Sequence, residues 1–395
     1  MFNKIYFNNI NTLELQIRNT LKRKKIYYWS PFLSPIATCK AVISSANSLI
    51  RFGSDYEPFV LNFFGEFNKV NNANRNEKTK FLNYYNLDFI KFLPSKGKIG
   101  SRFSFLIIFL LGFFPLKKIL KKNKPDYLII QLITSLPLVL LIFFNFETKF
   151  ILRISGYPRM NFLRKILWKI AFKKIYLITC PTNNTLNFIK SLNLIDPSKI
   201  KLLYDPVIEV KEINIKKNEK IDLDNFFLSV GRLTKQKNFM FLCKAFKELI
   251  KENNELKLVI AGSGEEESKL KRFINKHELQ NNIILLGYVK NIYPYFKNSK
   301  GFILSSLWED PGFVLIEASY CRASVLSSNS WPGPIELIKD KFNGIIFESN
   351  NMESFLKKFR YFIKLDNMHE IKLNNLKLSK KFTLFSHYKN LAKLI

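Results

Sequence analysis

Short apolar runs alternate with amphipathic segments along most of the chain. This pattern is typical of parallel strands separated by helices in an open α/β sheet. In the first half it predicts strands at residues 26–32, 59–64, 127–132, 149–155 and 175–180. In the second half it predicts strands at residues 226–231, 257–262, 283–287, 301–306, 324–328 and 344–347.

Two series of strands predict two doubly wound α/β domains. A length of 395 residues agrees with this, because single domains hold roughly 100 to 200 residues. The composition turns polar after Asp205, across residues 211–225, so we place the linker there. We expect domains at residues 1–205 and 206–375, followed by an amphipathic helix within residues 376–395. Ligands bind outside the carboxyl ends of strands in such sheets, so two facing domains imply a cleft.

Two longer apolar stretches raise the question of a membrane span. Residues 127–144 are nearly long enough to cross a bilayer, but polar residues and Pro137 interrupt them. We therefore predict a strand, a turn and a buried helix there. Residues 103–116 are too short to cross and precede a lysine cluster between 117 and 124. They predict a helix that is either buried in the core or inserted into one leaflet of a membrane.

The net charge of +32 is concentrated in the first half, where residues 1–205 carry 32 Lys and Arg against 10 Asp and Glu. Such a field attracts phosphates, whether on nucleic acid or on anionic lipid. The chain has no recognition-helix pattern and no aromatic platform for single strands, which argues against nucleic-acid binding. We expect an anionic membrane surface as a partner, with a merely solvated basic surface as the alternative.

The cysteines and the first residues indicate a cytoplasmic protein. Four scattered cysteines form no CxxC pair, which argues against a disulfide framework and a zinc site. The first 25 residues are polar and end in a basic run, so we expect no secretory signal.

Glu309 and Glu317, eight positions apart, form the strongest chemical motif, SSLWEDPGFVLIEAS. The Pro-Gly pair between them ends a loop and opens a helix whose first amides would be free to hold an anion. Two carboxylates and a helix N-terminus suit a ligand that has both hydroxyls and a phosphate. Spacing alone leaves open that Glu309 caps the helix and that Glu317 is merely solvated.

A second motif, SVGRLTKQKN, ends a strand at Gly231 and places Arg232 and Lys237 after it. Arginine offers a fork and lysine a point charge, so the two cations suit a diphosphate, although they are also ordinary surface charges. Gly262 precedes a helix in IAGSGEEESKL, and Glu336 follows a Gly-Pro break in SSNSWPGPIELI. Taken singly, both segments are ordinary loops.

In their order and spacing, these motifs resemble the carboxy-terminal half of glycosyltransferase family 4 over residues 226–347, and the first half matches in outline. The resemblance implies the GT-B architecture of two facing Rossmann-like domains, with a final helix, within residues 376–395, that crosses back to the first domain; an ordinary surface helix is the alternative. It also implies that Arg232 and Lys237 hold the nucleotide diphosphate, that Glu317 binds the ribose hydroxyls, and that Glu309 contacts the donor sugar. The remaining donor contacts that it implies are Gly231, Gly262, Gly287, Tyr288, Val289, Pro311, Gly312, Phe313 and Val314.

The first half departs from that family in two ways. Many members carry a glycine pair after the first strand, where this chain has PFLSPIATCK with the small residues Ser34 and Thr38. Many members also use a histidine near the sugar, yet the histidines here stand at positions 277, 369 and 387. The segment RISGYPR supplies acceptor-side candidates in Arg153, Gly156 and Arg159. The alternative is that the two arginines are ordinary surface charges without such a role.

We therefore expect a retaining glycosyltransferase that moves a hexose-type unit from a nucleotide sugar to a lipid-linked or cell-surface polysaccharide or lipopolysaccharide acceptor. No cofactor or metal is expected, because cations and amides would stabilise the departing diphosphate. The one DxD-like string, residues 222–224, reads as linker. The basic, apolar-rich first half indicates peripheral attachment to the inner face of the cell membrane. A soluble acceptor and a non-catalytic binding homologue are the alternatives.

Overall fold

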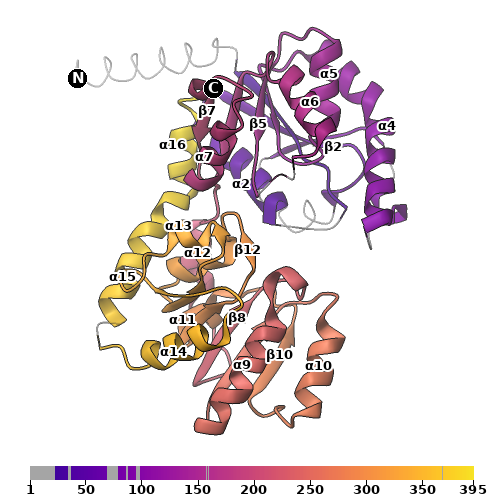
Figure 1. Ribbon diagram of the computed structural model, residues 1–395. Helices are drawn as coiled ribbons and strands as arrows, with labels where there is room; N and C mark the ends of the chain where they lie inside the picture. Colours follow the sequence, from indigo (N-terminus) through magenta and orange to yellow (C-terminus); the bar gives the residue numbers. More distant parts are fainter. Residues whose placement is uncertain are drawn as a thin grey trace, which may run out of the picture.

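The computed structural model describes residues 23–33, 37–68, 79–85, 88–94, 98–156, 158, 160–366 and 368–395. It contains two large parallel sheets, one in each half of the chain, and each is covered by helices (Figure 1). This confirms the prediction of two doubly wound α/β domains.

The first sheet has seven strands in the order β3-β2-β1-β4-β5-β6-β7, and every neighbouring pair is parallel. The strands are β1 (Lys24–Trp29), β2 (Tyr56–Asn62), β3 (Lys80–Asn83), β4 (Tyr127–Ile130), β5 (Lys149–Arg153), β6 (Leu177–Cys180) and β7 (Ile200–Leu202). The helices are α2 (Ala37–Phe52), α4 (Lys98–Asn123), α5 (Ser135–Phe143), α6 (Phe162–Ala171) and α7 (Asn183–Ser191). All five predicted strands are present, and the two edge strands β3 and β7 were not predicted.

The second sheet has six strands in the order β10-β9-β8-β11-β13-β15, again all parallel. The strands are β8 (Phe226–Val230), β9 (Lys257–Ala261), β10 (Ile283–Gly287), β11 (Gly301–Leu304), β13 (Val325–Ser328) and β15 (Ile345–Phe347). The longer helices are α9 (Phe239–Glu252), α10 (Glu267–Lys276), α12 (Phe313–Tyr320), α14 (Met352–Phe362) and α15 (Met368–Ser379). All six strands lie where the apolar runs predict them.

Each sheet separates two hydrophobic cores, because successive side chains of a strand point to opposite faces. In β1, Tyr27 and Trp29 pack into one cluster while Ile26 and Tyr28 pack into the other. Strands buried on both faces read as continuous apolar runs, which is why the sequence reveals them.

The chain crosses between the domains twice, and the two crossings lie side by side. The amides of Val207 and Ile208 both donate to the carbonyl of Phe382, at 2.9 Å. After the second crossing, α16 (Leu384–Leu391) packs on α2 of the first domain, as Figure 1 shows. The predicted boundary after residue 375 falls inside α15. The tract 211–225 is not simply a linker, because α8 (Val210–Lys216) occupies its start and buries Ile213.

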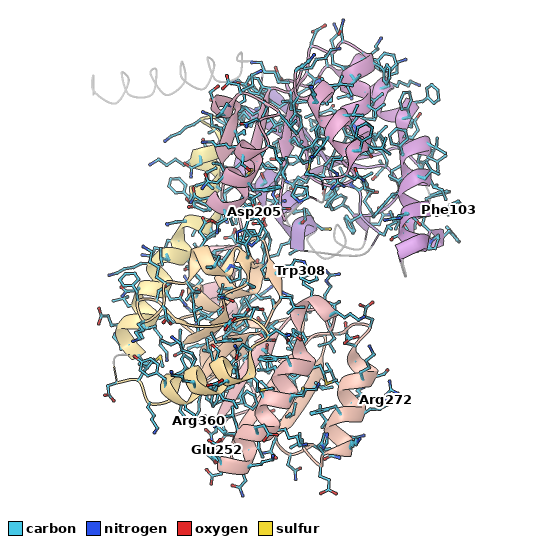
Figure 2. All side chains as sticks on the ribbon, in the orientation of Figure 1. Phe103, Asp205, Glu252, Arg272, Trp308 and Arg360 are labelled. Carbon is cyan, nitrogen blue, oxygen red and sulfur yellow. The ribbon has the colours of Figure 1, made fainter. Side chains whose placement is uncertain are left out.

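The two apolar stretches have different structures. Residues 127–144 form a strand, a turn and a buried helix, as predicted. Within the described part of the chain, Gly100–Asn123 is the one helical stretch long and apolar enough to cross a membrane, and a third of its most apolar window is buried. One side of α4 packs into the core through Ile108, Leu116 and Leu120. The other side is apolar and exposed, with Phe103 on its outer surface (Figure 2).

Candidate functional site

Lys237 and Glu309 form an ion pair near the carboxyl edge of the second sheet. Lys237 ends the short turn that follows β8, and Glu309 belongs to the two-residue strand β12 (Trp308–Glu309). The Lys237 Nζ donates to Glu309 Oε1, and the Ser306 hydroxyl donates to the same oxygen at 2.8 Å. Only 13% of the lysine side chain and 9% of the glutamate side chain are exposed. The structure thus brings together two residues predicted from separate motifs.

Glycines let three loops pack backbone against backbone around this pair. A Cβ on Gly262 would lie 1.9 Å from the Gly231 carbonyl oxygen, and a Cβ on Gly264 would lie 2.5 Å from the Leu233 carbonyl oxygen. Between these loops the Leu233 amide donates to the Ser263 carbonyl at 2.9 Å. Side chains at these glycine positions would push the loops apart, so the glycines are needed to build the floor of the site.

The loop after Glu309 ends at a helix N-terminus, as predicted. Gly312 has a positive φ of 99° and caps α12. The first intrahelical bond runs from the Leu315 amide to the Gly312 carbonyl at 3.1 Å. In the described residues, the amides of Phe313 and Val314 have no acceptor. These two donors, together with the helix dipole, form a place that favours an anion. Pro311 also packs closely, since a Cβ on Gly333 would lie 2.1 Å from its carbonyl oxygen.

Glu317 lies in α12 and is held by a residue of the first domain. The Lys40 Nζ donates to Glu317 Oε1 at 2.8 Å and to the Tyr293 hydroxyl at 3.1 Å. Glu317 is buried, so the prediction's alternative of a merely solvated glutamate is wrong. Neither Lys40 nor Tyr293 was predicted. The signal for Lys40 was its place at the end of PFLSPIATCK, the segment that replaces a glycine pair.

The remaining residues that were predicted on the donor side lie at the ends of their strands. Gly287 ends β10 with a positive φ of 69°, and its carbonyl accepts from the Gly262 amide at 2.7 Å. Tyr288 is exposed and Val289 is half-buried. Arg232 is exposed, and its guanidinium forms no ion pair with any described residue. Arg232 and Tyr288 are therefore accessible to a ligand.

The acceptor-side candidates have diverse environments. Arg153 is almost fully buried and makes a bidentate pair with Asp205, its Nε donating at 2.8 Å and its Nη2 at 2.5 Å, so it is not a surface arginine. Gly156 donates its amide to Asp310 across the domain boundary. Thr38 is half-buried in the first turn of α2. Ser34 and Arg159 lie outside the described residues.

Two further carboxylates join the domains, and the sequence analysis missed this role for both. Asp310 accepts from the Thr185 hydroxyl at 2.8 Å and the Thr182 hydroxyl at 3.1 Å, in addition to the Gly156 amide. Burial raises the pKa of Asp310, and these donors oppose the rise. Glu336 accepts from the first amides of α7, at 3.0 and 2.9 Å. In Figure 2, Asp205 and Trp308 lie where the two domains face each other.

The described residues contain no group of three His, Cys, Asp or Glu side chains that could hold a metal ion. Asp222 and Asp224 are exposed in the loop before β8. His387 lies in α16 and bonds to the Ser45 hydroxyl at 2.8 Å and to the Tyr204 carbonyl at 2.7 Å. It therefore anchors the last helix to the first domain.

Comparisons with known proteins bear on the second domain most directly. The family described as "Glycosyl transferases group 1" matches residues 210–377. An uncharacterized glycosyltransferase of Methanocaldococcus jannaschii, MJ1059, is 33% identical across 57% of this chain and 61% of its own length. The N-acetylgalactosamine-N,N'-diacetylbacillosaminyl-diphospho-undecaprenol 4-alpha-N-acetylgalactosaminyltransferase of Campylobacter jejuni is 31% identical across 57% of this chain and 62% of its own length. The match therefore spans about three fifths of both relatives.

A solved structure extends the likeness to both domains. The Anabaena protein Alr3699/HepE, in complex with UDP and glucose, superposes with a TM-score of 0.67 over 94% of this chain and 98% of its own chain. At 14% identity this likeness concerns the fold. It confirms the predicted GT-B architecture.

Proposed function

The chain belongs to the group 1 glycosyl transferases, and from that premise we propose that it transfers a sugar from a nucleotide-sugar donor to a lipid-linked or cell-surface polysaccharide or lipopolysaccharide acceptor. The observation that carries the proposal is the cluster at the carboxyl edge of the second sheet. There the buried pair of Lys237 and Glu309 lies just before the unpaired amides of Phe313 and Val314.

The donor diphosphate would lie between the cations and the helix N-terminus. Lys237 and Arg232 would offset its charge, and the amides of α12 would donate to its oxygens. Glu317 would accept from the ribose hydroxyls, and Glu309 would contact the sugar. The base would lie along Gly287, Tyr288 and Val289.

Bond cleavage at the anomeric carbon builds negative charge on the departing diphosphate. Preorganised cations and amides stabilise the transition state, in which this charge develops, more strongly than they stabilise the ground state. They therefore lower the barrier. We propose that this makes a metal unnecessary and that the acceptor hydroxyl attacks from the leaving-group face, with retention of configuration. No cofactor enters the scheme beyond the nucleotide sugar.

The acceptor side of the proposal is supported by the Campylobacter relative, whose name specifies a diphospho-undecaprenol glycan. The first domain carries an exposed apolar surface on three helices, which we call the α4–α6 surface. Its residues are Phe103, Phe105, Leu106, Leu110, Phe114, Phe143, Phe162, Leu163, Ile166 and Ile170. Lysines and arginines flank it, as expected for a protein that binds the anionic inner face of a membrane. Vesicle flotation tests this part, and a lack of binding to anionic vesicles would argue for a soluble acceptor.

A thermal-shift series with UDP-, GDP- and ADP-sugars tests the donor site. A ligand at 100 times its dissociation constant should raise the free energy of unfolding by about 2.7 kcal/mol. UDP-sugars come first, because the Anabaena structure contains UDP. Lys237→Ala and Glu317→Ala should abolish most of the response. Lys235→Ala is the matched control, because Lys235 is exposed in the same turn. If the Lys237 and Lys235 variants respond alike, the donor assignment is wrong.

A further inference from the structure

Glu317 gives one carboxylate oxygen to the first domain and keeps the other open. Its Oε1 accepts from the Lys40 Nζ at 2.8 Å. Its Oε2 accepts from no described residue and is not fully enclosed, and a tenth of the side chain is exposed. A carboxylate can accept about four hydrogen bonds, so a hydroxyl group can bind Oε2 without displacing the lysine.

The other two carboxylates that join the domains have no such open oxygen. Asp310 accepts from a threonine hydroxyl at Oδ1, and from a second threonine hydroxyl and an amide at Oδ2. Glu336 accepts at Oε1 and at Oε2 from the first residues of α7. Both of these carboxylates are fully used by the first domain. Among the three, Glu317 is therefore the one that the first domain binds and still leaves available to a ligand.

Lys40 reaches Glu317 from the first turn of α2, across the boundary between the domains. Its ammonium also donates to the Tyr293 hydroxyl at 3.1 Å and lies 5.8 Å from the centre of that ring. Burial lowers the pKa of Lys40, but the Glu317 carboxylate and Tyr293 outweigh burial and raise it. The lysine therefore stays charged, and a charged partner at Oε1 fixes the orientation of the carboxylate.

Tyr293 links this pair to the segment along which the base would lie. It starts α11 (Tyr293–Asn298) and stands four residues after Val289, the last residue of that segment. Four extended residues span at most about 14 Å, so Tyr293 and Glu317 lie within reach of a ribose attached to the base. Tyr293 is 7% exposed, and burial raises the pKa of its hydroxyl, so the phenol adds no second negative charge beside Glu317.

We propose that Lys40 is a positioning residue for the donor's ribose. The lysine stays bound to Oε1 of Glu317 and holds the carboxylate so that Oε2 accepts from the ribose hydroxyls. The inference rests on the proposed function, in which Glu317 binds the ribose, and it assigns part of nucleotide recognition to the first domain. Lys40 and the ribose thus bind the same carboxylate at the same time.

Calorimetry on the full chain with UDP and with dideoxy-UDP, which lacks both ribose hydroxyls, tests the role of Lys40. Lys40→Met should weaken UDP by about tenfold, because the carboxylate loses the charge that orients it. The same variant should change dideoxy-UDP binding by less than about twofold, because that nucleotide has no hydroxyl for Glu317. Lys40→Arg keeps a cation that can reach the carboxylate and should restore most of the affinity for UDP.

Arg51→Met is the matched control. Arg51 lies in the same helix as Lys40, and their side chains are 46% and 45% exposed. Arg51 also forms an ion pair, with Glu209, but it is eleven positions further along α2 and far from Glu317 in that helix. Its variant should bind UDP with unchanged affinity.

The outcomes separate this inference from the proposed function. Tighter binding of UDP to Lys40→Met would mean that the donor displaces the lysine, and it would overturn the inference. Unchanged binding, equal losses for UDP and dideoxy-UDP, or equal losses in the Lys40 and Arg51 variants would overturn it as well. If GDP or ADP is the nucleotide that binds, the same comparison uses its dideoxy analogue. If UDP, GDP and ADP all fail to bind the unaltered chain, the proposed function itself is refuted.

Discussion

Removing the carboxylate of Asp205 should destabilise the first domain strongly. Arg153 and Asp205 face each other with 7% and 3% of their side chains exposed, and the pair is bidentate. Asp205→Asn keeps the shape of the side chain but leaves a guanidinium that cannot lose its proton. Breaking a buried pair in this way typically costs about 3 to 5 kcal/mol. For a domain of this size that lowers the melting temperature by roughly 6 to 20 °C.

Urea unfolding followed by the fluorescence of Trp29 and Trp168, both in this domain, measures the loss. Asp222→Asn is the control, since Asp222 is exposed and should change stability by less than about 0.5 kcal/mol. Arg153→Met combined with Asp205→Asn should recover about 1 to 3 kcal/mol relative to Asp205→Asn alone, because no unpaired charge remains. Equal losses in the Asp205 and Asp222 variants, or no recovery in the double variant, would refute the reasoning.

Two further predictions concern the contacts between the domains and the last helix. Burial lowers the pKa of His387, whose Nδ1 donates to a carbonyl. Below about pH 6.5 the unfolded chain therefore binds a proton at this histidine, whereas the folded chain does not. The free energy of unfolding should therefore fall as the pH drops from about 6.5. Melting temperatures measured between pH 7.5 and 5.5 should show a smaller dependence on pH in His387→Gln. His369→Gln, at an exposed position, is the control and should keep the original dependence. Glu336→Ala removes the acceptor at the start of α7 and should cost about 0.5 to 2 kcal/mol in thermal unfolding; a loss no greater than that of Glu348→Ala would contradict the bridging role.

The sequence reveals the interior of this fold better than its edges. The central strands are buried on both faces, so their apolar runs are unmistakable, whereas β3 and β7 are short edge strands with exposed positions. Lys237 and Glu309, which the structure brings into contact, could be predicted as candidates because each of their motifs is local. Asp310 and Glu336 were missed as links between the domains because their partners lie more than 120 residues away in the other domain. Arg153 was predicted on the acceptor side because nothing in the local sequence indicates its pairing with the distant Asp205.

The carboxylates along the cleft show how the first domain contacts the predicted donor site. Glu309 is paired by Lys237 of its own domain, whereas Asp310, Glu317 and Glu336 are all bound by groups of the first domain. A donor that uses Glu317 must share that carboxylate with Lys40 or displace it. Coupling between two binding events is reciprocal. A donor that weakens the contact between Lys40 and Glu317 would therefore also weaken the contact between the two domains. If Glu317 binds the donor as proposed, the first domain contacts the donor site through Lys40, at the end of the segment where the resembled family has glycines.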